Sequence, residues 1–232
     1  MVKPKVLLTG AAGGLGQIFA KALVQAGYEL VATDCIAFAA PEQAHKILAD
    51  LTNPSEVKKL LEAVGEVDIL INNAALMPLV PLSDLSLELW RKIQAVNIDA
   101  PFFLAQALCP GMVQRGFGRV INLASSTIWG PPAGMAAYVT SKMGVIGLTR
   151  ALAAEFGAGG VTVNAISPGL TKHEATIKHL PLGAFEGVKA RQFVQRTEEP
   201  EDLVGPILFL ASRESAFITG QVINVDGGGF GF

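Results

Sequence analysis

The sequence predicts an α/β fold: a doubly wound, mostly parallel sheet of seven strands with helices on both faces. Two observations lead to this prediction. Short apolar runs alternate with longer amphipathic stretches along most of the chain, as in repeated β-α units. The first apolar run, Val6 to Leu8, is followed at once by a glycine-rich turn, Thr9 to Gly16, and then by an amphipathic stretch. We therefore expect one domain over residues 1–232, without linker or repeat.

The individual elements follow from hydrophobic periodicity. Strands are expected near residues 5–9, 29–33, 46–49, 67–71, 119–124, 161–166 and 222–225. Helices are expected near residues 14–26, 55–64, 84–113, 135–157 and 200–212. Only Cys35 to His45 joins the second and third strands, so the helix that usually connects parallel strands is expected to be reduced to a loop. Residues 170–195 have weak periodicity and are expected to form a substrate lid.

The glycine-rich turn predicts a nucleotide site. Its spacing, T-G-x-x-x-G-x-G, differs from a phosphate loop ending in Gly-Lys-Ser/Thr, which argues against kinase or ATPase chemistry. Glycines let the backbone approach a diphosphate, and the following helix offers unpaired N–H groups. The second strand ends in Asp34, placed to accept hydrogen bonds from the adenosine ribose. Because its carboxylate would repel a 2′-phosphate, this Rossmann-type domain is expected to bind NAD rather than NADP.

Tyr138 and Lys142 predict acid–base chemistry on an alcohol. On a helix they lie at i and i+4, on one face and one turn apart. A phenol with a reference pKa of about 10 is a poor base, and a neighbouring ammonium is expected to lower that pKa. Ser125, at the end of the fifth strand and thirteen residues before Tyr138, is the candidate for holding the substrate oxygen. Ser126 is a competing candidate.

The chain resembles the short-chain dehydrogenase/reductase family over nearly all its 232 residues. The matching segments are Thr9 to Gly16, Asp50-Leu51-Thr52, Asn72 to Ala75, Asn97, Ser125, Tyr138 with Lys142, Ser167-Pro168-Gly169 and Gly220 to Gly228. The resemblance implies a catalytic tetrad of Asn97, Ser125, Tyr138 and Lys142. It implies that NAD is bound by Gly10, Gly14, Leu15, Gly16, Asp34, Asp50, Leu51, Asn73, Ala74, Tyr138, Lys142, Pro168, Gly169 and Thr171.

By the same resemblance, Asp50 contacts the adenine, Asn73 and Ala74 line the ribose side, and Pro168-Gly169 passes beside the nicotinamide. The family often has a threonine four residues after that glycine to hold the carboxamide. Here His173 occupies the position, and Thr171 is the possible substitute.

A role for the Asn97 carbonyl is also indicated by the position of Pro101. Pro101 lies four residues later in the predicted helix, and a proline cannot donate a hydrogen bond to the carbonyl at i−4. In the family, this carbonyl holds a water that links the catalytic lysine to solvent. A proline that only bends the helix is the alternative.

Three functions remain open from the sequence. The first is an NAD-dependent dehydrogenase of a secondary alcohol, such as a sugar, polyol or hydroxy acid. The second is a 3-oxoacyl-thioester reductase, and the third a non-catalytic NAD-binding regulator. Substrate contacts are expected from Ser125, Tyr138 and Trp129.

Composition bounds the partners. A net charge of −2 argues against a nucleic-acid surface. The sequence contains no run of about 18 uncharged apolar residues, so no membrane span is predicted. The two cysteines and the start of the chain predict a cytoplasmic protein. Three scattered histidines predict no metal site. Surplus apolar residues in helices 84–113 and 135–157 predict a homotetramer, or a homodimer, and the two phenylalanines of the C-terminal tail are expected near a neighbouring subunit.

Overall fold

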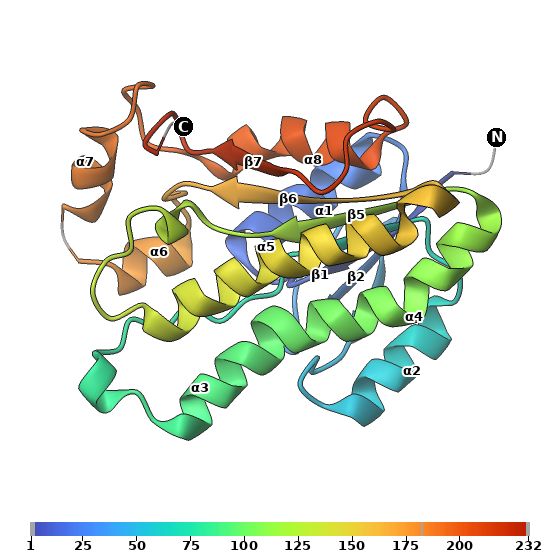
Figure 1. Ribbon diagram of the computed structural model, residues 1–232, viewed down its shortest axis with the longest axis horizontal. Coiled ribbons are helices and arrows are strands. Elements are labelled where there is room, and N and C mark those ends of the chain that lie inside the picture. Colours follow the sequence, from blue (N-terminus) through green and yellow to red (C-terminus); the bar gives the residue numbers. More distant parts are fainter. Residues whose placement is uncertain (1–2, 182, 231–232) are drawn as a thin grey trace.

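Seven parallel strands form the sheet of the computed structural model, which describes residues 3–181 and 183–230 (Figure 1). They are β1 (Lys5–Thr9), β2 (Glu29–Asp34), β3 (His45–Leu48), β4 (Ile69–Asn72), β5 (Gly118–Leu123), β6 (Val161–Pro168) and β7 (Val222–Val225). Their spatial order is β3-β2-β1-β4-β5-β6-β7, and every pairing is parallel. The doubly wound sheet predicted from the sequence is therefore confirmed. The order reverses between β1 and β4, which is where such sheets bind ligands.

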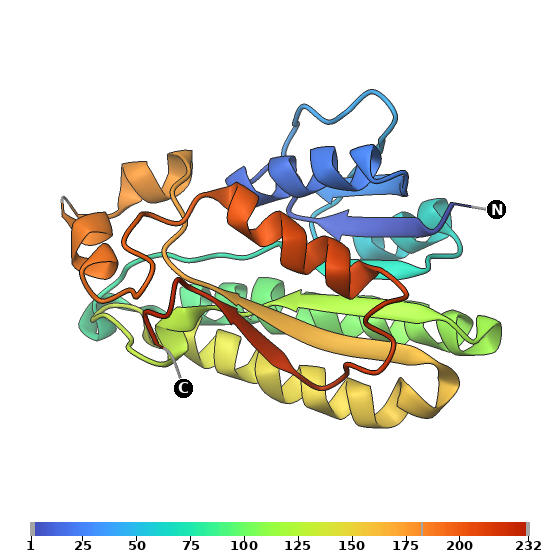
Figure 2. The same ribbon diagram turned by 90° about the horizontal axis from the view of Figure 1, so that it is seen from above.

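Helices cover both faces of the sheet, as Figures 1 and 2 show. One face carries α1 (Gly14–Gln25) and α8 (Val204–Ala211). The other carries α2 (Pro54–Val64), α4 (Ala100–Arg115) and α5 (Ala136–Phe156). The strands are almost continuously apolar because both of their faces are buried against helices.

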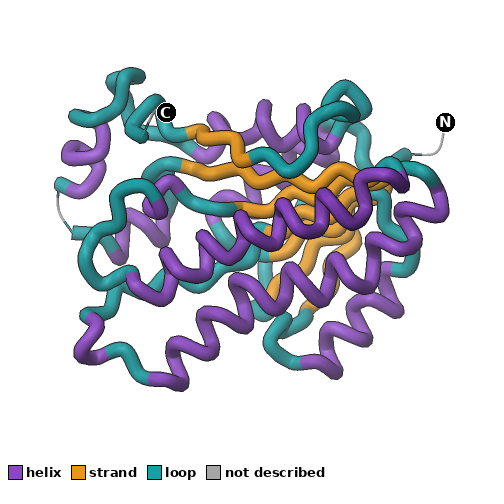
Figure 3. Tube along the Cα trace, viewed as in Figure 1, coloured by secondary structure: helices purple, strands orange, loops and turns teal. Residues whose placement is uncertain are grey.

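The predicted helix over residues 84–113 is not one α-helix. A 3-10 turn (Leu82–Asp84) precedes α3 (Leu87–Gln94), a π-helical segment (Ala95–Asp99) follows, and α4 completes the rod (Figure 3). Within the π-helical segment the Ala100 N–H bonds to the Ala95 carbonyl, five residues back. The cause is Pro101, which has no N–H for the Asn97 carbonyl, so the helix widens there instead of kinking.

Two connections bear on the site. The stretch between β2 and β3 is a loop, as predicted from its length. The stretch over residues 170–195 is more ordered than predicted, because it contains the short helices α6 (Glu174–His179) and α7 (Ala184–Lys189). Both lie at the end of the molecule toward which the carboxyl ends of the strands point (Figure 1).

The helical stretch Leu87–Arg115 is long and apolar enough to cross a membrane by length and composition alone, with a mean hydropathy of 1.2 over its most apolar window. Here it packs as a core helix, with Leu104, Ala105 and Met112 fully buried against the sheet. Core helices commonly pass the same test.

Candidate active site

A cavity of about 880 Å³ lies at the carboxyl ends of β1, β4, β5 and β6. Of the predicted residues, the structure brings eight together around this cavity: Leu15, Asn73, Ser125, Tyr138, Lys142, Pro168, Gly169 and Thr171. Gly10, Gly14 and Gly16 belong to the turn between β1 and α1 and the start of α1, and Asp34 is hydrogen-bonded to this turn. One cavity thus joins the candidate nucleotide turn to the candidate catalytic side chains.

In the glycine turn the backbone packs so closely that Gly10 and Gly16 leave no room for side chains, which forms an open backbone cradle. Gly10 has φ +67°, and a Cβ there would lie 2.7 Å from the Ala74 backbone. A Cβ on Gly16 would collide with the Gly10 carbonyl. Asn73 holds the cradle, since its Nδ2 donates to the carbonyls of Thr9 (3.0 Å) and Gly10 (2.9 Å). A side-chain-free turn at a helix N-terminus fits the diphosphate of a dinucleotide.

Asp34 is the last residue of β2, and its side chain is hydrogen-bonded to this turn. Its Oδ2 accepts a hydrogen bond from the Ala12 N–H at 2.9 Å, and its Oδ1 accepts one from the Ile36 N–H at 3.3 Å. The half-buried carboxylate therefore stands beside the turn, where the sequence placed it for a ribose contact.

Asp50 and Leu51 follow β3 on the same side of the molecule. Asp50 Oδ1 accepts hydrogen bonds from the N–H (2.9 Å) and Oγ1 (2.8 Å) of Thr52, and Leu51 packs against the core.

Ser125 and Tyr138 form the polar centre of the cavity. Ser125 Oγ lies 2.9 Å from Thr127 Oγ1 and accepts a hydrogen bond from the Thr127 N–H. Burial raises the pKa of the Tyr138 phenol, and a hydrogen bond with the Ser125 hydroxyl opposes that rise. Ser125 and Ser126 both line the cavity, and this interaction favours Ser125 as the partner of the tyrosine.

Lys142 is buried beside the tyrosine, with Nζ 5.6 Å from the ring centroid. Nζ donates a hydrogen bond to the Leu123 carbonyl at 2.6 Å. Burial lowers the pKa of this ammonium to about 8, so the group can exchange a proton near neutral pH. The expectation that Lys142 lowers the phenol pKa is wrong for this geometry. The ammonium is directed at a carbonyl, and burial of the phenol dominates.

Asn97 acts behind the cavity wall. Its buried side chain accepts from the Leu76 N–H (2.8 Å) and donates to the Leu76 carbonyl (3.0 Å) and to Ser141 Oγ (2.9 Å). These bonds join the loop after β4, the π-helical segment and α5. Ser141 was missed from the sequence, because nothing marks a serine within Y-x-x-x-K as a link between helices.

The structure separates the roles of Thr171 and His173. Thr171 Oγ1 is buried and donates to Glu198 Oε1 at 3.0 Å, so its donor is already used. His173 lies directly on the glycine turn, since a Cβ on Gly14 would be 2.5 Å from His173 Cβ. Within the described residues, the buried His173 Nδ1 has no partner. Of the two predicted candidates, His173 is the one whose side chain keeps a nitrogen without a hydrogen-bond partner among the described residues.

Trp129, predicted as a substrate contact, lies outside the lining of the cavity. It is half-exposed and directs Nε1 toward Asn224 Oδ1 at 3.4 Å. The 3-10 turn after Ser125 carries it toward β7 instead. Side chains from the lid and the tail line this part of the cavity, including Arg191 and Phe230. The sequence did not single these out as site residues, because their segments carry no motif. The described side chains contain no group of three His, Cys, Asp or Glu that could hold a metal.

Known proteins are similar to this chain in sequence and fold over nearly its whole length. A family model described as enoyl-(acyl carrier protein) reductase matches residues 10–229. The chain is 37% identical over 238 residues to the (2S)-[(R)-hydroxy(phenyl)methyl]succinyl-CoA dehydrogenase subunit of Thauera aromatica, covering 96% of this chain and 94% of that protein. It is 34% identical over 237 residues to a 3-oxoacyl-[acyl-carrier-protein] reductase of Thermotoga maritima, covering 96% of each. A 4-hydroxyisoleucine dehydrogenase mutant complexed with NADH and succinate superposes with a TM-score of 0.92 at 28% identity, covering 98% of this chain and 99% of that one.

Proposed function

Since the chain belongs to the short-chain dehydrogenase/reductase family and is an oxidoreductase acting on CH–OH groups, we propose that it is an NAD-dependent dehydrogenase of a secondary alcohol. One observation carries the proposal. Ser125, Tyr138 and Lys142 meet in the cavity that also reaches the glycine turn. The half-buried carboxylate of Asp34 beside that turn favours NAD(H) over NADP(H), because it would repel a 2′-phosphate.

In the proposed mechanism Ser125 holds the substrate oxygen and Tyr138 exchanges its proton. When bound, the nicotinamide supplies the hydride chemistry, taking a hydride from the carbinol carbon in oxidation and returning one in reduction. In oxidation the hydroxyl proton passes to the Tyr138 phenolate and the C–O bond becomes a carbonyl. The raised pKa of the phenol makes it a proton donor at neutral pH, which suits reduction.

We assign the positioning roles to Lys142 and Asn97. Lys142, with a pKa of about 8, would receive or return the phenol proton and would hold the nicotinamide ribose when the nucleotide is bound. The Asn97 carbonyl, left without an α-helical donor by Pro101, is the proposed anchor for the relay to solvent. The Asn97 side chain keeps α5 and the loop after β4 in register.

A panel of secondary alcohols, hydroxy acids and their ketones, assayed with both nicotinamide nucleotides, tests the function. We expect turnover of at least one pair, with a higher kcat/KM for NAD(H). Acetoacetyl-CoA belongs in the panel, because one relative is a 3-oxoacyl-[acyl-carrier-protein] reductase and shares this class of chemistry. Nucleotide binding without turnover of any member would favour the non-catalytic regulator instead.

We further propose a cytoplasmic homotetramer. Phe102 and Phe103 on α4 and Met143 on α5 are 37%, 48% and 50% exposed, which leaves apolar surface for isologous packing. The tail supports the assembly less than expected, because Phe230 packs against Gly130 of its own chain, and Phe232 lies outside the described residues. Light scattering should give a mass near four times 24.3 kDa, and the mass of one chain would refute the proposal.

A further inference from the structure

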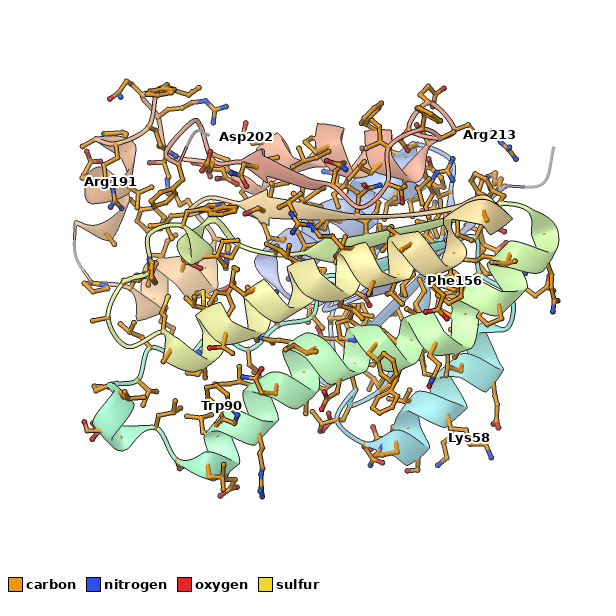
Figure 4. The ribbon with its side chains drawn as sticks, in the orientation of Figure 1. Lys58, Trp90, Phe156, Arg191, Asp202 and Arg213 are labelled. Atoms are coloured by element: carbon orange, nitrogen blue, oxygen red, sulfur yellow. The ribbon has the colours of Figure 1, made fainter. Side chains whose placement is uncertain are left out.

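Arg191 lies in the wall of the catalytic cavity. It follows α7 by two residues and lines the same space as Ser125 and Tyr138. Figure 4 shows it at the α7 end of the molecule, away from Arg213 at the opposite end. The mechanism above gives this guanidinium no task.

The guanidinium rests on an aromatic platform. The Arg191 Cζ lies 5.6 Å from the centroid of the Phe230 ring. The ring is itself fixed, because the Phe230 N–H donates to Asp226 Oδ2 at 3.1 Å and Phe230 Cζ lies 2.7 Å from the position of a Cβ on Gly130. A guanidinium stacked on a ring keeps its N–H edge free for a planar acceptor such as a carboxylate.

The charges around the cavity leave this cation unpaired. Over residues 3–181 and 183–230, Arg191 forms no ion pair, and no aspartate or glutamate lines the cavity. The Lys142 ammonium donates to the Leu123 carbonyl. Arg191 is exposed at the edge of the cavity, and apolar side chains, among them Met77, Met135 and Val188, line much of the remaining wall.

We propose that Arg191 binds the carboxylate of the substrate, so that the enzyme acts on hydroxy acids and their oxo acids rather than on neutral sugars or polyols. The proposal rests on the function proposed above and selects one substrate class for that site. A bidentate pair between the guanidinium and the carboxylate would hold the substrate in the cavity that Ser125 and Tyr138 also line.

Matched substrates test the assignment: 3-hydroxybutyrate against 3-hydroxybutyramide, and gluconate against glucitol. The wild-type enzyme should prefer the acid of a pair by roughly tenfold or more in kcat/KM. Arg191→Met keeps the apolar stem and should raise KM for the acid roughly tenfold to a hundredfold, leaving the neutral partner nearly unchanged. The KM of Arg191→Lys for the acid should lie between those of the wild type and Arg191→Met. Lys189→Met is the control, because Lys189 pairs with Glu186 at 2.5 Å and lies outside the cavity lining.

Equal use of acid and neutral partner by the wild type, or an equal loss for both in Arg191→Met, would overturn the proposal. A higher kcat/KM for acetoacetyl-CoA than for every acid would do the same. If no alcohol in the panel is turned over, the proposed function fails. Calorimetric titration of the acids in the presence of NADH then tests carboxylate binding at Arg191 independently of turnover. The proposal for Arg191 is upheld if Arg191→Met loses acid binding and Lys189→Met keeps it. It is rejected if the wild-type protein does not bind the acids.

Discussion

Replacement of Asp34 by asparagine isolates the charge that we expect to select NAD. Asp34 has two tasks: it presents a negative charge beside the glycine turn, and it accepts the Ala12 N–H at 2.9 Å. Asparagine keeps an acceptor oxygen for Ala12 and removes the charge. Asp34→Ala removes both.

The magnitudes of the two tasks differ. Repulsion between the carboxylate and a 2′-phosphate in partly buried contact costs on the order of 1–3 kcal/mol, or roughly tenfold to a hundredfold in affinity. Loss of the Ala12 hydrogen bond costs both nucleotides about 1–2 kcal/mol. Asp34→Asn should therefore strengthen NADPH binding and leave NADH binding within a few-fold, whereas Asp34→Ala should also weaken both.

Fluorescence titration of NADH and NADPH at fixed ionic strength measures these dissociation constants directly. Asp50→Asn is the matched control, because the adenine contact expected of Asp50 would be common to both nucleotides and its loss should leave the ratio of the two dissociation constants unchanged. The reasoning is wrong if the wild type binds NADPH as tightly as NADH, or if Asp34→Asn leaves the ratio unchanged.

Three further outcomes are expected. Tyr138→Phe removes the proton carrier and should lower turnover by roughly a hundredfold or more with NADH affinity retained; residual turnover of a tenth would contradict the mechanism. Because burial raises the pKa of Tyr138, alcohol oxidation should accelerate and ketone reduction slow as pH rises through the alkaline range, as steady-state rates in both directions will show. Burial raises the pKa of the Glu198 carboxyl from 4.5 to about 7, so the folded state holds this proton more tightly than the unfolded state and loses stability between those pH values. The loss, at most about 3 kcal/mol, should appear in urea unfolding at pH 5 and pH 8 and should shrink in Glu198→Gln; an unchanged difference would reject the assignment.

The fold was predictable because its signals are local. Apolar runs such as Val6 to Leu8 are bounded by turn residues, and each marks a strand buried on both faces. The π-helical segment was not predictable, since Pro101 shows only that one hydrogen bond is missing and not whether the helix bends or widens.

The site likewise contains residues that local sequence predicts and residues that it does not. Tyr138 and Lys142 are set by helical spacing, so their adjacency follows from sequence alone. The carboxylate that uses the Thr171 hydroxyl is Glu198, twenty-seven residues away. Arg191 reaches the cavity through the packing of two segments without motifs. Contacts between distant parts of the chain decide these two cases, and no local pattern encodes them.

The position of Phe230 has a practical consequence for work with this enzyme. The ring is part of the cavity wall and the platform under Arg191, so a fusion partner inserted close after Phe230 would adjoin the proposed substrate site. The amino end of β1 lies at the opposite end of the molecule from α6 and α7, which contribute residues to the cavity wall (Figure 2). Protein for substrate screening is therefore best prepared with a tag placed before β1, because a fusion directly after Phe230 would alter the measured specificity while leaving the fold intact.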